Sequence, residues 1–150
     1  MIPAAPTLEG YIGFCRTIAG ITPLVMPSTS TGFEETFCFA KQWVPQDQLQ
    51  CASPMLYTAA VYNWGVSLLI ELQPDQPGQC FFQDLRKTFR TNNFVPGVIS
   101  SAADQSTSDS LTVGKALSNM SLMDLQRAND PFGRRALGIC MEMGSLWGLN

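Results

Sequence analysis

A long uncharged segment in the middle of the chain constrains the fold more than any other feature. From Ala52 to Ile70 there is no charged residue. Ser53 and Pro54 form a typical helix start, because serine is a good N-cap and proline fits the first turn, where its missing N–H costs nothing. The polar residues that follow recur every four positions and form one narrow, wet stripe: Asn63, Ser67 and Glu71. Every other side is apolar, so we predict a helix to about Leu72 that is central and surrounded.

This segment must also be compared with a membrane span. A spanning helix needs about 20 predominantly apolar residues and usually has basic flanks. Four polar residues interrupt this one, and no Lys/Arg cluster flanks it: Ser53, Thr58, Asn63 and Ser67. We therefore predict a buried core helix and no membrane insertion. The N-terminus likewise lacks the basic flank and continuous apolar core of a signal peptide.

Amphipathic patterns predict further helices around the central one. Apolar residues recur at steps of three and four, between capping residues and Gly or Pro. The predicted helices run, capped by Thr7, from Leu8 to about Ala19, from Phe33 to Val44, from Gln79 to about Arg90, after Ser121, and, capped by Asp130, from Phe132 to about Met143. Residues 1–6 are expected to form an extended arm and residues 144–150 an apolar tail. A chain of 150 residues without repeats then makes one domain, a mainly α, small helical bundle.

The region Gly97–Gly114 has a different composition. It is rich in Ser and Thr and contains no aromatic residue. Val98 and Ile99 favour a short strand, and Leu111 and Val113 alternate with polar residues at a period of two. We predict a long loop or a two-stranded β-hairpin that projects from the helical body. Loops of this length in a compact domain are usually functional or disordered.

Composition removes several classes of chemistry. The chain has no histidine, which is the commonest general base and metal ligand. Its five cysteines include no C-x-x-C, so a metal site is not expected, and we predict buried, reduced thiols in a cytosolic product. Glu34 and Glu35 are adjacent on a predicted helix and point in different directions, so they do not form an acid–base dyad. There is no Gly-rich phosphate loop. We predict a protein that is not an enzyme and has no cofactor.

The charge content indicates which partners to expect. Only 14% of the residues are charged, and the net charge is −3, whereas an average soluble domain has about 25% charged residues. A monomer so poor in charge has difficulty covering itself with a solvated surface, so we expect several faces to lie against other chains. The negative balance excludes affinity for nucleic acid through overall charge.

The last two-thirds of the chain has a characteristic order of segments. A helix of the form Ser-Pro-x-x-Tyr-x-x-Ala begins at Ser53, and a Gly-Val-x-Ser-Ser segment begins at Gly97. The chain then closes on the stretch Asp130-Pro131-Phe132-Gly133-Arg134-Arg135-Ala136-Leu137 and an apolar C-terminus. Over roughly residues 50–150 this order resembles the head–tail connector (adaptor) proteins of tailed bacteriophages, which often end in a similar Thr-Pro-Tyr-Gly-Arg helix. Asp130 in place of Thr keeps the cap, and Phe132 in place of Tyr keeps the aromatic ring.

The resemblance implies a structural subunit of the virion that is made in the cytoplasm of the host bacterium. About twelve copies would form a homo-oligomeric ring in the neck, between the portal protein and the downstream neck or tail protein. Genomic DNA would pass through its lumen without sequence-specific binding, and the negative subunit charge would let the DNA slide. The residues expected to bind the portal or the next ring are Arg134, Arg135, Leu146, Trp147 and Leu149. The residues expected in the loop between subunits are Val98, Ile99, Leu111 and Val113.

An alternative function belongs to a different class. The chain would be a small helical ligand-binding or regulatory protein with a pocket beside the 53–72 helix. Asn63 and Ser67 would supply its polar contacts. This alternative needs neither a ring nor a portal, so molecular mass in solution and on viral particles distinguishes the two.

Overall fold

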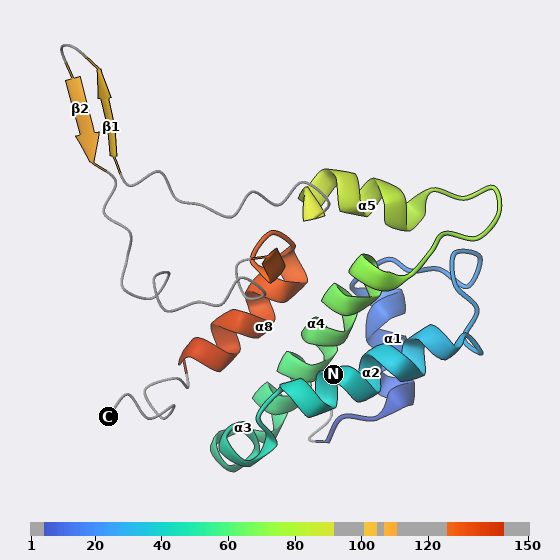
Figure 1. Cartoon of the computed structure of the whole chain (residues 1–150). Helices are drawn as coiled ribbons and strands as arrows, with labels where there is room; N and C mark the ends of the chain where they lie inside the picture. The colour runs from blue at the N-terminus through green and yellow to red at the C-terminus, as the bar shows by residue number, and fades with distance from the viewer. Residues whose placement is uncertain (1–4, 92–100, 105–106, 111–125, 143–150) are drawn as a thin grey trace.

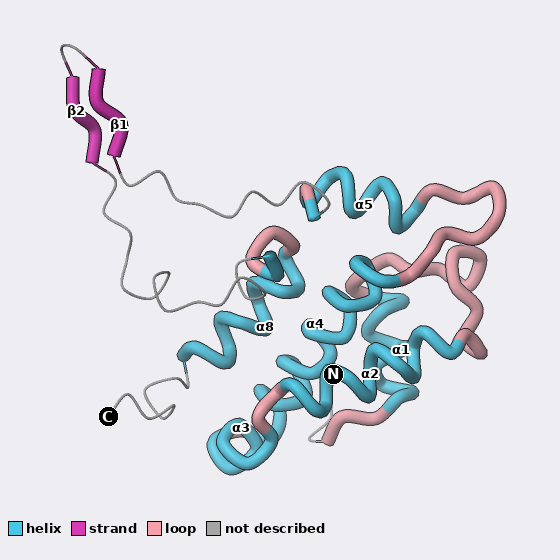
Figure 2. The backbone as a smooth tube through the Cα atoms, in the orientation of Figure 1, coloured by secondary structure: helices cyan, strands magenta, loops and turns pink. Residues whose placement is uncertain are grey.

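The computed structural model describes residues 5–91, 101–104, 107–110 and 126–142. In this part the protein is mainly helical, as the sequence predicts. Its helices are α1 (Leu8–Thr17), α2 (Thr31–Trp43), α3 (Gln46–Ala52), α4 (Pro54–Leu72), α5 (Phe81–Phe89) and α8 (Pro131–Glu142). Two short strands, β1 (Ser101–Asp104) and β2 (Thr107–Ser110), pair antiparallel with Ser101 opposite Ser110. Figure 2 shows the helices gathered in one body and the strands in a separate hairpin.

Helix α4 is the centre of the fold (Figure 1). It spans the predicted residues, and every residue from Tyr57 to Ile70 is buried. Helices α1, α2, α3, α5 and α8 all contact it. The apolar sides of α4 are therefore covered by the chain itself and not by other chains. Ser53 has the extended backbone of an N-cap, but its hydroxyl makes no capping hydrogen bond, so that part of the prediction is wrong. No helix in the described ranges is long and apolar enough to cross a bilayer.

An aromatic cluster joins α1 and α2 to α4. The ring of Tyr11 lies 5.6 Å from that of Phe37 and 5.9 Å from that of Tyr62, measured between centroids. The hydroxyl of Tyr11 is hydrogen-bonded to Oγ1 of Thr36 at 3.0 Å, so this buried polar atom is satisfied. The hydroxyl of Tyr62 accepts a hydrogen bond from the backbone N–H of Thr7 and so holds the start of α1. Thr7 is also the predicted cap, since its Oγ1 accepts from the N–H of Gly10 at 3.1 Å.

Helix α3 is the element that the sequence pattern did not indicate. It has seven residues, of which Leu49 is buried. One apolar residue among polar neighbours creates no periodicity, so local sequence gives no helical signal here. Packing against α4 forms this helix.

The amphipathic pattern of residues 79–90 predicts that Arg86 points outward, and this prediction is wrong. Its Nη1 donates to the backbone carbonyls of Ile70 at 2.9 Å and Gln73 at 2.8 Å. Its Nη2 lies 3.8 Å from a carboxylate oxygen of Asp75. Carbonyls at the end of a helix lack intrahelical partners, and a cation there satisfies them. Arg86 thus fixes α5 to the C-terminal end of α4.

Gly65 provides a direct test of the packing around α4. A glycine inside a helix suggests the close approach of another backbone, but a Cβ added at Gly65 would lie 2.8 Å from Cε2 of Tyr11, so the close neighbour is a ring. The ring is buried between Phe37 and Tyr62 and has little room to move. We expect Gly65→Ala to lower the free energy of unfolding by about 1–3 kcal/mol in urea denaturation followed by circular dichroism.

The matched control is Gly13→Ala on α1. A Cβ at Gly13 meets nothing within 4 Å. Because alanine has the higher helix propensity, we expect unchanged stability or a gain of up to about 1 kcal/mol. If Gly65→Ala is as stable as Gly13→Ala, the packing of Tyr11 described above is wrong.

Candidate functional site

Two of the predicted partner-binding residues lie in the described part of the chain. Arg134 and Arg135 are both exposed on α8. The guanidinium carbon of Arg135 lies 6.0 Å from the centroid of the Phe132 ring. The other predicted residues lie outside the described ranges: Leu146, Trp147, Leu149, Val98, Ile99, Leu111 and Val113. The strands β1 and β2 fall between the two places where the sequence suggested strands, and Figure 1 shows their hairpin apart from the helical body.

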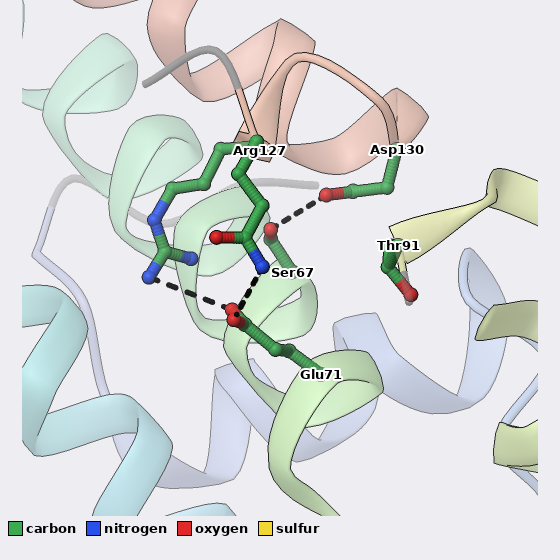
Figure 3. A pocket seen from close by; sticks show the side chains of 6 residues that line it. Ser67, Glu71, Thr91, Arg127 and Asp130 are labelled. Carbon is green, nitrogen blue, oxygen red and sulfur yellow. Dashed lines mark hydrogen bonds and ion pairs between the residues drawn. The ribbon is translucent and has the colours of Figure 1, made fainter. Parts of the chain in front are cut away.

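Asp130 is the N-cap of α8, as the sequence predicts, and it sets the position of this helix. Its Oδ1 accepts hydrogen bonds from the backbone N–H groups of Phe132 at 2.9 Å and Gly133 at 2.7 Å. Its Oδ2 accepts a hydrogen bond from Oγ of Ser67 on α4 at 2.7 Å (Figure 3). One buried carboxylate therefore starts α8 and attaches it to the central helix. Gly133 is required in this tight turn, because a Cβ there would collide with the carbonyl oxygen of Arg127.

Arg127 forms a second contact between this segment and α4. Its guanidinium carbon lies 4.7 Å from the centroid of the Trp64 ring, a cation–π arrangement. Its Nη2 is 3.8 Å from a carboxylate oxygen of Glu71, and Nε2 of Gln126 donates to the other oxygen of Glu71 at 3.1 Å. Figure 3 shows Arg127 and Asp130 above the residues of α4 that they meet.

These contacts correct the prediction of a wet stripe on α4. Asn63 and Ser67 are buried, Ser67 donates to Asp130, and Glu71, whose side chain is 33% exposed, meets Arg127. Asn63 donates from its side-chain amide to the carbonyl of Ala59 at 2.8 Å. The C-terminal segment therefore docks on Ser67 and Glu71 of this stripe. The helical period identified the stripe but did not show what covers it.

The space left inside this cluster is small. It measures about 10 Å³ and is lined by Ser67, Glu71, Thr91, Gln126, Arg127 and Asp130. That is about the room of a single water molecule. Ser67, which the alternative function uses as a ligand contact, already donates its hydroxyl to Asp130. Among the residues that the structure describes, no group of three or more His, Cys, Asp or Glu side chains is placed to hold a metal ion.

The cysteines differ from the prediction of buried thiols. Cys15 is fully buried, and this burial raises the pKa of its thiol to about 12. Cys38, Cys51 and Cys80 are exposed, and Cys140 is half-buried. The prediction of burial relied on apolar neighbours in the sequence, such as Phe37 and Phe39 beside Cys38, but residues adjacent on a helix point to different sides of it.

Comparison with known proteins identifies no relative: no family model, curated protein or solved structure matches this chain. The functional conclusion must therefore come from the chain's own residues and contacts. The contacts that join α8 to α4, and the exposed arginines that α8 then presents, are the features with consequences for a partner.

Asp130 is the residue whose loss we expect to release α8. Asp130→Ala removes one cap and leaves the buried Ser67 hydroxyl without its acceptor, so we expect a loss of about 2–4 kcal/mol of unfolding free energy. Asp130→Asn keeps an acceptor and should lose less. Asp84→Ala is the control, because Asp84 is an exposed acid paired only with exposed Lys87, and it should change stability by less than about 0.5 kcal/mol. Equal stability of the two alanine variants in urea denaturation would contradict this role.

Thiol labelling tests the distribution of the cysteines. A protonated, buried thiol reacts poorly, since the thiolate is the nucleophile. In the native protein we expect iodoacetamide to modify Cys38, Cys51 and Cys80 and to leave Cys15 unmodified, as read by peptide mass spectrometry. In concentrated urea Cys15 should react as well. Rapid native labelling of Cys15 would show that the α1–α4 interface opens.

Proposed function

We propose that this protein is a ring-forming head–tail connector subunit of a tailed bacteriophage. The observation that carries the proposal concerns the two segments on which the resemblance rests. The Ser-Pro helix, α4, and the Asp-Pro-Phe-Gly-Arg helix, α8, pack together through Ser67–Asp130 and Trp64–Arg127. The two helices are therefore one structural unit. Such a unit is expected if the order of these segments along the chain is a shared feature of adaptor proteins.

Exposed apolar residues at one end of the bundle support a role in assembly. Three of them come from the last residue of α2 and the first turn of α4, and these helix ends lie together beside α3 in Figure 1: Trp43, Met55 and Leu56. Single exposed apolar residues are normal on a monomer, but a group at one end favours contact with another chain. This group supports the proposal more directly than the low charge content, much of which reflects the buried helix α4.

The alternative of a ligand-binding protein has weaker support. Its proposed pocket beside α4 has room for about one water molecule within the described residues, and drug-sized ligands occupy about 300–1,000 Å³. The connector requires no pocket. Its parts would be the helical body for the ring, residues 97–114 for a neighbouring subunit or ring, and residues 134–150 for the portal or the next ring.

Assembly is the decisive measurement for this proposal. We expect light scattering and negative-stain electron microscopy to show rings of the purified protein, or a monomer in solution that forms a ring on portal-bearing capsids. A chain that stays monomeric at high concentration and is absent from purified particles would contradict the connector function.

The apolar tail offers a specific variant. Deleting Leu146–Asn150 should leave the circular dichroism and thermal unfolding unchanged and should reduce attachment to portal-bearing capsids by about tenfold or more, because large aromatic anchors dominate such contacts. Trp147→Ala should give much of this loss, whereas its matched control Ser145→Ala should not. A normal yield of joined particles after the deletion would argue against a portal-binding tail.

A further inference from the structure

The outer face of α2 is acidic and has no partner within the described chain. Its residues line an open groove of about 400 Å³: Thr31, Glu34, Glu35, Cys38, Phe39 and Gln42. Glu34 and Glu35 are exposed, and no cation of the described ranges forms an ion pair with either. Lys41, the one basic residue of α2, lies 5.6 Å from the Phe37 ring centroid.

The outer face of α8 is basic and equally open. Arg134 is exposed and meets no carboxylate among the residues described, and Arg135 beside it is exposed as well. By contrast, Arg127 and Arg86 have acidic neighbours, which are Glu71 and Asp75. Within the described residues, the arginine pair of α8 therefore has no acidic partner.

The two faces match along their helices. On α2, Phe39 follows the glutamate pair by about one turn and is 50% exposed. On α8, Gly138 follows the arginine pair by about one turn, and a Cβ there would meet nothing within 4 Å. If the helices run parallel, Glu34 and Glu35 face the arginines while Phe39 faces the open side of Gly138. Small residues allow such close approach, and opposite charges set the register.

The outer faces of α2 and α8 are positioned so that one copy of the protein can contact the next in a repeating arrangement. Helices α2 and α8 both contact α4 and lie on opposite sides of it, and Figure 1 shows that they run in the same general direction. A copy rotated about a ring axis can therefore lay its α8 along the α2 of the preceding copy. Such a head-to-tail contact uses two different surfaces of each subunit and forms a ring when the rotation between successive copies closes.

We propose that the outer face of α2 in one copy binds the outer face of α8 in the next, and that this contact builds the ring. The inference rests on the proposed connector function and names the surfaces through which its copies meet. It assigns Arg134 and Arg135 to the interface between subunits and leaves the portal to the C-terminal tail. Charge attraction orients the copies, and Phe39 supplies the apolar area.

Charge reversal tests the contact. Glu34→Arg/Glu35→Arg and Arg134→Glu/Arg135→Glu should each weaken ring formation, in solution or on portal-bearing capsids, by about a hundredfold, because like charges then face each other. The chain carrying all four substitutions should recover most of the affinity. An equal mixture of the two double variants should also recover it by alternating around the ring. Glu9→Arg/Asp47→Arg changes the net charge equally at two exposed acids and should have little effect.

A disulfide test identifies the contact directly. In the Gly138→Cys variant, native Cys38 of one copy should lie near the new thiol of the next, and mild oxidation should give a ladder of covalent oligomers. Peptide mass spectrometry should find positions 38 and 138 linked. Cys38→Ser/Gly138→Cys controls for the other thiols and should give no ladder above the wild-type background.

The outcomes separate this inference from the function on which it rests. Rings that form without a 38–138 link and tolerate both charge reversals overturn the interface and leave the connector function standing. Reversal of the arginine pair that preserves rings but prevents attachment to capsids assigns the pair to the portal and also overturns the interface. A chain that forms no ring in solution or on capsids overturns both.

Discussion

The hydrogen bond between Ser67 and Asp130 is the contact on which the arrangement of the C-terminal half depends. Helix α4 is buried from Tyr57 to Ile70, where a hydroxyl group without a hydrogen-bond partner is costly. Asp130 satisfies Ser67 and also the first N–H groups of α8. Because one carboxylate does both, the direction of α8 and the outward placement of Arg134 follow from the burial of α4.

The sequence predicts α4 closely because its signal is dense. A segment without charge between a Ser-Pro start and a Pro-containing turn has few alternatives, and its bounds agree with those observed. The cover of its polar stripe was not predictable, since helical periodicity says which residues share a face and nothing about what lies against it. The partners of that stripe, Arg127 and Asp130, lie some 60 residues along the chain from Trp64 and Ser67. Arg86 was misplaced for the same reason, because its partners are carbonyls of another helix.

The prediction from low charge needs a similar distinction. A shortage of charge indicates either a surface shared with other chains or a large interior, and here much of it is interior, because α4 is enclosed by five helices of its own chain. The exposed surface has three distinct features. These are an apolar group at one end of the bundle, an acidic face on one side of α4 and a basic face on the other. Composition could suggest that contacts exist, but the fold was needed to place them and to show that they differ in sign.

The strength of the α2–α8 contact determines when a ring would form. An exposed ion pair contributes only about 0.2–1 kcal/mol, whereas even a dissociation constant of about 1 mM requires about 4 kcal/mol. Two such pairs and one half-exposed phenylalanine make a weak contact between free subunits. In a closed ring each subunit has two of these contacts, and binding to a common portal raises the effective concentration of neighbours to the millimolar range or above. Weak, charge-matched faces are therefore suited to a subunit that stays monomeric until a portal gathers its copies, so that rings form at the capsid and not in the surrounding solution.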